Sequence, residues 1–221
     1  MEKIIKRRVR VGKIDLDTCG AAFLLGVSRA DEVEILSCEA SSEDLADPAV
    51  ICIEVGMSGE TQLNNWDHHG VSKDLPSATK QVWVARGEKE EYSRLVEYID
   101  LLDRKGIKSL GTSLADIFAG MLLITRDPVE QLFRGVEMLR EVVHRGIDPF
   151  GLGRMSIEEI PGWSVFAAAK AENNRQVAAA VKEARWATTV HGRRMAYLET
   201  DFYGAPGALY EVGAEIVVVF S

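Results

Sequence analysis

Acidic and imidazole side chains recur in the first third of the chain, each at the carboxyl end of a predicted strand. In chain order they are Asp15, Asp17, Glu54, Asp67, His68 and His69. In an open parallel sheet the carboxyl ends of the strands line one ligand-binding crevice, so residues distant in sequence converge there. Carboxylates combined with imidazole, without thiolates, suit Mn²⁺ or Mg²⁺ better than structural zinc. The pattern therefore predicts a divalent-metal site.

Four extended segments are predicted to position these groups. They cover residues 9–15, 33–38, 49–55 and 62–66, which are rich in apolar and β-branched residues. Asp15 and Asp17 share strand parity, so both side chains are expected to aim at one site. Either Thr18 or Asp17 is expected to cap the helix that follows. Strands alternating with helices indicate right-handed crossovers and a mostly parallel sheet, which is an α/β fold.

Helices dominate the middle of the chain, and a small mixed segment closes it. Apolar residues at three- and four-residue spacing predict helices over residues 77–85, 90–104, 112–125, 128–144 and 163–186, with a Gly- and Pro-rich linker at 146–154. Strands at 194–199 and 215–220 enclose a short helix at 208–212. We therefore expect an α/β metal-binding domain (1–125), a helical connector (126–190) and a small C-terminal β-α-β segment (191–221).

Composition narrows the class of protein. The chain has 221 residues, 47% hydrophobic and 27% charged, with a formal net charge of −8. These values exclude general disorder, and no apolar run approaches the roughly 20 residues of a membrane helix. The acidic balance argues against wrapping long duplex nucleic acid, which needs many cations, but it permits a small phosphorylated substrate. Three cysteines without a C-x-x-C pair make a reduced, cytoplasmic setting the simplest interpretation.

The ordered motifs carry a resemblance to a known family. The runs KIDLDTCGAAFLL, ICIEVG, NNWDHHG and EYIDLLDRKG resemble the DHH phosphoesterase superfamily over roughly residues 8–125. That superfamily includes single-strand exonucleases, oligoribonucleases, cyclic-dinucleotide phosphodiesterases and manganese inorganic pyrophosphatases. The resemblance implies a phosphohydrolase or phosphodiesterase with two metal ions, usually manganese. Its substrate would be a small phosphorylated compound or a short oligonucleotide, attacked by a hydroxide held between the two ions.

The resemblance also implies roles for individual residues. As metal ligands it implies Asp15, Asp17, Glu54, His68 and Asp103. His69 would face the substrate phosphate, and Asp67 would orient the catalytic site from behind the ligands. Asp100 is a second candidate for the role of Asp103, because it lies one helical turn earlier.

The sequence departs from the family pattern in four places. Lys13 and Ile14 stand where the family often has a histidine, and Thr18 replaces a common glycine or acid. Glu54 replaces an aspartate, which moves the carboxylate by about 1.5 Å. The usual glycine-rich, histidine-containing motif near the C-terminus is missing. The C-terminal part is therefore abbreviated, or a partner subunit completes it in a homodimer, or the substrate is small. The alternative interpretation is a catalytically degenerate, nucleotide- or metal-binding regulatory protein.

One basic cluster near the C-terminus is a candidate for substrate binding. His191 and Arg193 lie just before the predicted strand at 194–199, Arg194 is its first residue, and the three offer cations to a phosphate. The alternative is an ordinary basic turn.

Overall fold

A four-stranded parallel sheet forms the N-terminal part of the protein. The computed structural model describes residues 6–70, 74–106, 113–153 and 156–221. The strands are β1 (Arg8–Val11), β2 (Glu32–Ile35), β3 (Val50–Ile53) and β4 (Asn65–Trp66), in the spatial order β2-β1-β3-β4. Val11 of the central strand pairs with Ile35 on one side and Ile53 on the other. Because every pairing is parallel, the carboxyl ends of the strands lie at one edge.

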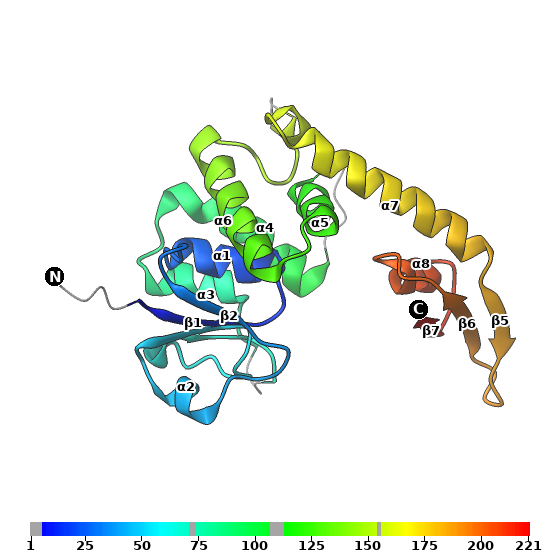
Figure 1. Cartoon of the computed structure of the whole chain (residues 1–221), viewed down its shortest axis with the longest axis horizontal. Helices are drawn as coiled ribbons and strands as arrows, with labels where there is room; N and C mark the ends of the chain where they lie inside the picture. The colour runs from blue at the N-terminus through cyan, green and yellow to red at the C-terminus, as the bar shows by residue number, and fades with distance from the viewer. Residues whose placement is uncertain (1–5, 71–73, 107–112, 154–155) are drawn as a thin grey trace.

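Helices cover both faces of this sheet (Figure 1). Helices α1 (Leu16–Leu24), α3 (Ala78–Ala85) and α6 (Pro128–Arg145) contact the strands on one face. Helices α4 (Glu90–Lys105) and α5 (Leu114–Ile124) pack on these helices and complete the main core. Val9 and Val11 point into that core and are fully buried. The short helix α2 (Ser42–Ala46) lies on the opposite face, where Leu45 packs on Val50 and Cys52. Because successive side chains of a β-strand point to opposite faces, the same strands pack against helices on both sides of the sheet.

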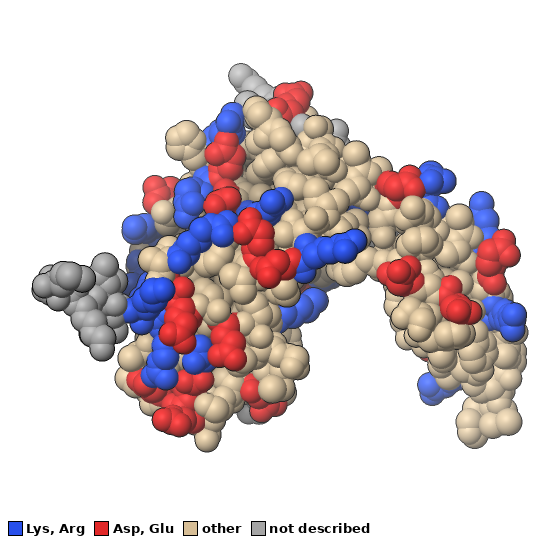
Figure 2. All heavy atoms as spheres, viewed as in Figure 1, with Lys and Arg blue, Asp and Glu red and all other residues tan. Residues whose placement is uncertain are grey.

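The C-terminal part is a second, smaller sheet carried by a long helix. Helix α7 (Ser164–Lys182) leads into β5 (Arg185–Thr188), β6 (Arg194–Glu199), α8 (Ala205–Glu211) and β7 (Ile216–Phe220). The order is β5-β6-β7, with an antiparallel and then a parallel pairing. Its core of Ala196, Leu198 and Leu209 is separate from the main core. Helix α7 contacts α5 in the first part of the protein and α8 in the C-terminal part. Figure 2 shows the two parts connected there, with open space between them beneath the connection.

The predicted α/β fold, with a helical middle and a small C-terminal α/β segment, is confirmed. Two element predictions were wrong. The segment 62–66 is mostly a 3₁₀ turn (Thr61–Leu63), and only Asn65–Trp66 is a strand. The helix predicted over 163–186 ends at Lys182, and Arg185–Thr188 forms β5 instead. The start of the helix predicted from 112 lies outside the described residues, as does the end of the linker at 154.

The domain boundaries at 125 and 190 stay a prediction, although the C-terminal sheet begins at Arg185. None of the helices in the described ranges is both long and apolar enough to cross a membrane. The cytoplasmic location and the homodimer stay predictions.

Candidate metal centre

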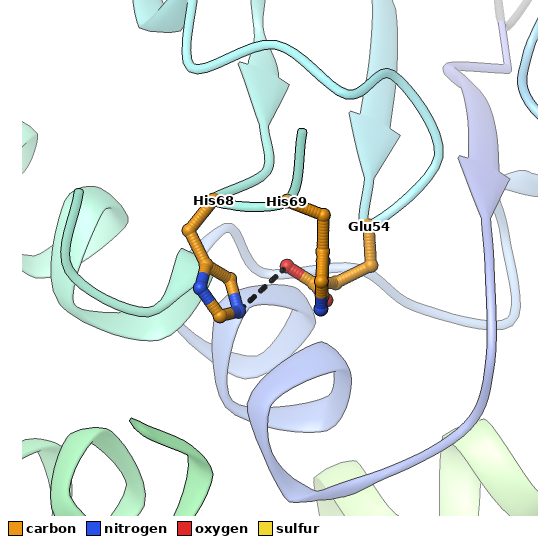
Figure 3. Close-up of side chains that lie close together, drawn as sticks. All are labelled: Glu54, His68 and His69. Carbon is orange, nitrogen blue, oxygen red and sulfur yellow. Dashed lines mark ion pairs between the residues drawn. The ribbon is translucent and has the colours of Figure 1, made fainter. Parts of the chain in front are cut away.

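Four side chains from four separate elements meet at the carboxyl edge of the parallel sheet. Asp17 lies in the first turn of α1, Glu54 directly after β3, His68 just after β4, and Asp103 in the last turn of α4. Figure 3 shows Glu54 beyond the arrowhead of β3, with His68 and His69 following the neighbouring strand. The parallel topology explains why residues so distant in sequence converge here.

The imidazole nitrogen of His68 lies at the middle of the cluster. Its Nε2 is 3.0 Å from Asp103 Oδ2, 3.8 Å from Glu54 Oε1 and 4.0 Å from Asp17 Oδ2. Two overlapping sets of three residues could each hold a metal ion, with ligand atoms within 4.8 Å of one another. They are Asp17, His68 and Asp103, and Glu54, His68 and His69. His68 belongs to both sets.

The N-terminus of α3 fixes the carboxylate of Asp17. The amide of Thr79 donates to Oδ1 at 2.8 Å, and the amide of Ala78 donates to Oδ2 at 2.7 Å. The hydroxyl of Thr79 also donates to the Asp17 carbonyl at 2.8 Å, which ties α1 to α3. Burial raises the pKa of Asp17 to about 6, while these backbone hydrogen bonds oppose the rise. Asp17 is therefore held in one orientation before any ligand arrives.

Both carboxylate oxygens of Asp67 accept hydrogen bonds from backbone amides. Oδ2 accepts hydrogen bonds from the amides of Gly56 and Met57 at 2.9 and 2.8 Å, and Oδ1 accepts one from the amide of His69 at 2.9 Å. The ring Nδ1 of His69 lies 2.9 Å from the same Oδ1 and 3.1 Å from Glu54 Oε2. Asp67 thereby orients both His69 and the turn that follows Glu54.

Two buried polar atoms at the cluster have no hydrogen-bond partner in the described part of the chain. They are Glu54 Oε1 and His68 Nε2, the latter close to Asp103 but not aligned for a hydrogen bond. Burial, together with the charges of Asp17 and Asp67, raises the pKa of Glu54 to about 10. The nearby Asp103 carboxylate raises the pKa of His68. Unpaired buried acceptors of this kind fit a divalent cation, and a set of oxygen and imidazole ligands suits Mn²⁺ or Mg²⁺.

Asp15 does not belong to either set of ligands. It is the N-cap of α1, where Oδ1 accepts a hydrogen bond from the Thr18 amide at 2.9 Å. The expectation that Asp15 and Asp17 share strand parity was wrong, because β1 ends at Val11 and the helix begins at Leu16. Asp15, rather than Thr18 or Asp17, is therefore the capping residue.

Asp100 also lies outside the ligand sets. Its carboxylate accepts hydrogen bonds from the Ser77 amide and from Lys80 Nζ, both at 3.0 Å. It thus supports the beginning of α3 rather than the cluster itself.

The predicted substrate-binding cations are not near the cluster. His191 and Arg193 are exposed in the hairpin between β5 and β6, on the side of the C-terminal part far from the parallel sheet (Figure 1). The guanidinium of Arg194 lies 4.6 Å from the centre of the Trp186 ring. Their role in substrate binding stays a prediction that this arrangement does not favour.

Sequence reasoning missed the two amides of α3 that hold Asp17. Backbone donors carry no residue signature, so only the close packing of α1 on α3 reveals them. That packing needs Gly20, because a Cβ there would lie 2.2 Å from Thr79 Oγ1.

The fold has a counterpart among solved structures. The chain is similar to a structure described as the pGpG-specific phosphodiesterase PggH from Vibrio cholerae. The TM-score is 0.55 and the identity 14%, over 96% of this chain and 77% of that one. No protein-family model matches the sequence, and neither does any curated protein. The likeness establishes a shared fold, so activity must be argued from the site.

Proposed function

We propose that the protein is a metal-dependent phosphohydrolase or phosphodiesterase of the DHH type. Its metal is manganese, with magnesium as the second choice, and its substrate is a small phosphorylated compound or a short oligonucleotide. The observation that carries the proposal is the approach of three carboxylates to within 3.0–4.0 Å of His68 Nε2. The likeness of fold to a phosphodiesterase structure supports the same reaction class.

The clustered side chains would hold up to two cations at the metal centre. Asp17, His68 and Asp103 would hold one cation, and Glu54, with its unpaired Oε1, would extend the site to a second. Such cations would act as Lewis acids toward phosphoryl oxygens and would lower the pKa of water. The anionic ligands offset the charge of the cations.

His69 would contact the substrate rather than the metal. Its side chain is 55% exposed, and Nδ1 already contacts Asp67 and Glu54. The other nitrogen, Nε2, is therefore the one that remains for a phosphoryl oxygen, to which it donates a hydrogen bond when the ring is protonated. Asp67 holds the ring in that orientation.

The test is manganese-stimulated hydrolysis of bis(p-nitrophenyl) phosphate by the wild type and two variants. His68→Ala and Asp17→Asn should each lower kcat/KM by about 100-fold or more and weaken manganese binding, because the first removes a ligand and the second removes the negative charge of one. His144→Ala is the matched control, since that histidine is exposed at the end of α6. If the two variants hydrolyse the diester and bind manganese as the wild type does, the proposal is wrong.

Metal stoichiometry separates the enzyme from the regulatory alternative. Two manganese ions per chain, with turnover, are expected for the enzyme. One ion or none, together with nucleotide binding and no turnover, would instead identify a catalytically degenerate regulatory protein.

A further inference from the structure

Gln81 of α3 connects two backbone segments beside the metal centre. The residue is 7% exposed, and its Nε2 donates hydrogen bonds to the carbonyl oxygens of Asp67 at 3.1 Å and of Pro76 at 2.8 Å. The first carbonyl belongs to the peptide bond that joins Asp67 to His68, whose imidazole lies at the middle of the cluster. Because a peptide group is planar, Gln81 fixes the plane from which His68 projects.

The same helix fixes a second side chain of the cluster. The amides of Ala78 and Thr79, at the start of α3, hold the carboxylate of Asp17. Gln81 lies about one helical turn after Ala78, so one element sets both the place of Asp17 and the backbone before His68. The separation of 4.0 Å between His68 Nε2 and Asp17 Oδ2 is therefore determined through α3.

The other half of the Gln81 amide argues against a role in packing alone. Its Oε1 is buried and has no hydrogen-bond partner among the described residues. A buried acceptor without a partner costs free energy, and an apolar side chain of similar shape would avoid that cost. The donor nitrogen, which holds two carbonyl groups, is the part of the side chain that accounts for an amide at this position.

The surroundings of the Asp67 carbonyl are closely packed. A Cβ on Gly59 would lie 3.3 Å from this oxygen and 3.6 Å from Gln81 Oε1, and it would clash with Leu75 Cδ1 at 2.3 Å. Asp67 itself is 3% exposed, so its carbonyl has little access to water. If Gln81 stopped donating, the peptide group would have to reorient to find another donor, because a buried carbonyl without a partner is costly.

We propose that Gln81 is a positioning residue of the metal centre, which sets the orientation of His68 through the carbonyl group of Asp67. The inference rests on the proposed function, because it assigns Gln81 to the centre that would perform the reaction. Loss of the donor leaves two buried carbonyl groups unpaired. The peptide before His68 then reorients, and Nε2 moves away from Asp17.

Gln81→Met tests this role, because methionine has a similar length but cannot donate a hydrogen bond. Val82→Ala is the matched control, since Val82 is the next residue of α3, is fully buried and contributes packing to the main core. Both variants should lower the melting temperature. Binding and activity are then measured at a temperature at which all the proteins are folded. Should Gln81→Met fail to fold, Gln81→Asn takes its place, because its amide is one methylene shorter and cannot span both carbonyl groups.

The first measurement compares manganese affinity, by isothermal titration, with the kinetics of bis(p-nitrophenyl) phosphate hydrolysis. Gln81→Met should weaken manganese binding about 10-fold and lower kcat at saturating manganese about 10-fold, with KM for the diester within about 2-fold of the wild type. Val82→Ala should stay within about 2-fold of the wild type in all three quantities. Equal manganese affinity in Gln81→Met and the wild type, or an equal loss in Val82→Ala, would overturn the inference.

The second measurement needs neither metal nor turnover. Crystal structures of the metal-free variants should show His68 Nε2 about 1 Å or more farther from Asp17 in Gln81→Met, a shift large enough to impair catalysis, and unmoved in Val82→Ala. An unmoved His68 in Gln81→Met would overturn the inference. A wild type that binds manganese but does not hydrolyse the diester would contradict the proposed function, whereas weaker manganese binding by Gln81→Met would still support the role of Gln81.

Discussion

The carboxyl group of Glu54 is held among other acids and away from water. Its side chain is 6% exposed, and the charges of Asp17 and Asp67 add to burial in raising its pKa. Keeping such a group in the folded protein opposes folding, because the unfolded chain ionises it freely at neutral pH. A cation removes that penalty, so the residue is arranged for metal binding at the expense of stability in the metal-free protein.

Glu54→Gln tests this trade-off. Glutamine keeps the shape but has no charge, so the metal-free variant should be more stable than the wild type by about 1–3 kcal/mol at pH 7. The variant should also lose most of the stabilisation that manganese gives the wild type. Thermal unfolding with EDTA and with manganese measures both effects, and Glu39→Gln, at an exposed acid, is the control. A less stable metal-free Glu54→Gln protein would contradict this account.

At the scale of residues, part of the site was predictable. Asp17, Glu54, His68 and Asp103 follow strands or end a helix in the expected order, and they do converge. Asp15 was not separable from Asp17, because a strand end and a helix cap place an acid at the same position. Whether Asp15 ends a strand or caps a helix depends on where β1 leaves the sheet, and tertiary packing determines that position.

The N-terminus of α3 is the element on which the site depends. It receives Asp17 from α1 and Asp100 from α4, each through backbone amides. Amides at the start of a helix have no partner within the helix and favour negative charge, so both acids stabilise the element. The helix thereby connects the metal centre to the helical layer.

Asp100→Asn tests the support given to α3. Burial alone would raise the pKa of Asp100, but hydrogen bonds from Ser77 and Lys80 hold it below its ordinary value. An acid of lowered pKa stabilises the fold above its unfolded pKa of about 4, and that stability is lost as pH falls through the folded pKa. The variant should lose about 1–3 kcal/mol at pH 7.

The difference from wild type should shrink as the pH falls below about 4, because Asp100 then takes up its proton more readily in the unfolded chain than in the folded one. Urea unfolding at pH 7 and pH 3 measures it, with Asp201→Asn at an exposed acid as the control. A difference that stays constant with pH would show that charge plays no part.

At the scale of elements, periodicity predicted where helices exist better than where they end. Helices α4 and α6 have strong one-sided patterns and end at Gly106 and Gly146, as left-handed caps do. Helix α7 has a weak pattern, rich in alanine, and the apolar residues beyond it fit a strand equally well. Only the pairing of β5 with β6 decides between the two.

For the whole molecule, the contact of α7 with α5 sets the position of the C-terminal sheet. The helices approach closely because Gly120 has no side chain, and a Cβ there would lie 1.9 Å from the backbone oxygen of Phe166. Gly120→Ala should therefore lower stability by about 1–3 kcal/mol, as overpacking does, and speed proteolysis within α7.

Gly207→Ala is the matched control for that change. It replaces a glycine within α8, where no atom beyond the chain neighbours and the backbone of the same helix lies within 4 Å of the added Cβ, so stability should not fall. Equal behaviour of the two variants in thermal unfolding and limited proteolysis would contradict the role assigned to the α5–α7 contact. Sequence alone could not supply this contact, because Gly120 lies within an ordinary apolar helix.

The central claim is that Asp17, Glu54, His68 and Asp103 share divalent cations. The most direct test is anomalous scattering at the manganese edge from a crystal of the full chain soaked in manganese. The account predicts strong peaks within coordination distance of His68 and of the three carboxylates. Manganese peaks elsewhere, with none at this cluster, would contradict it.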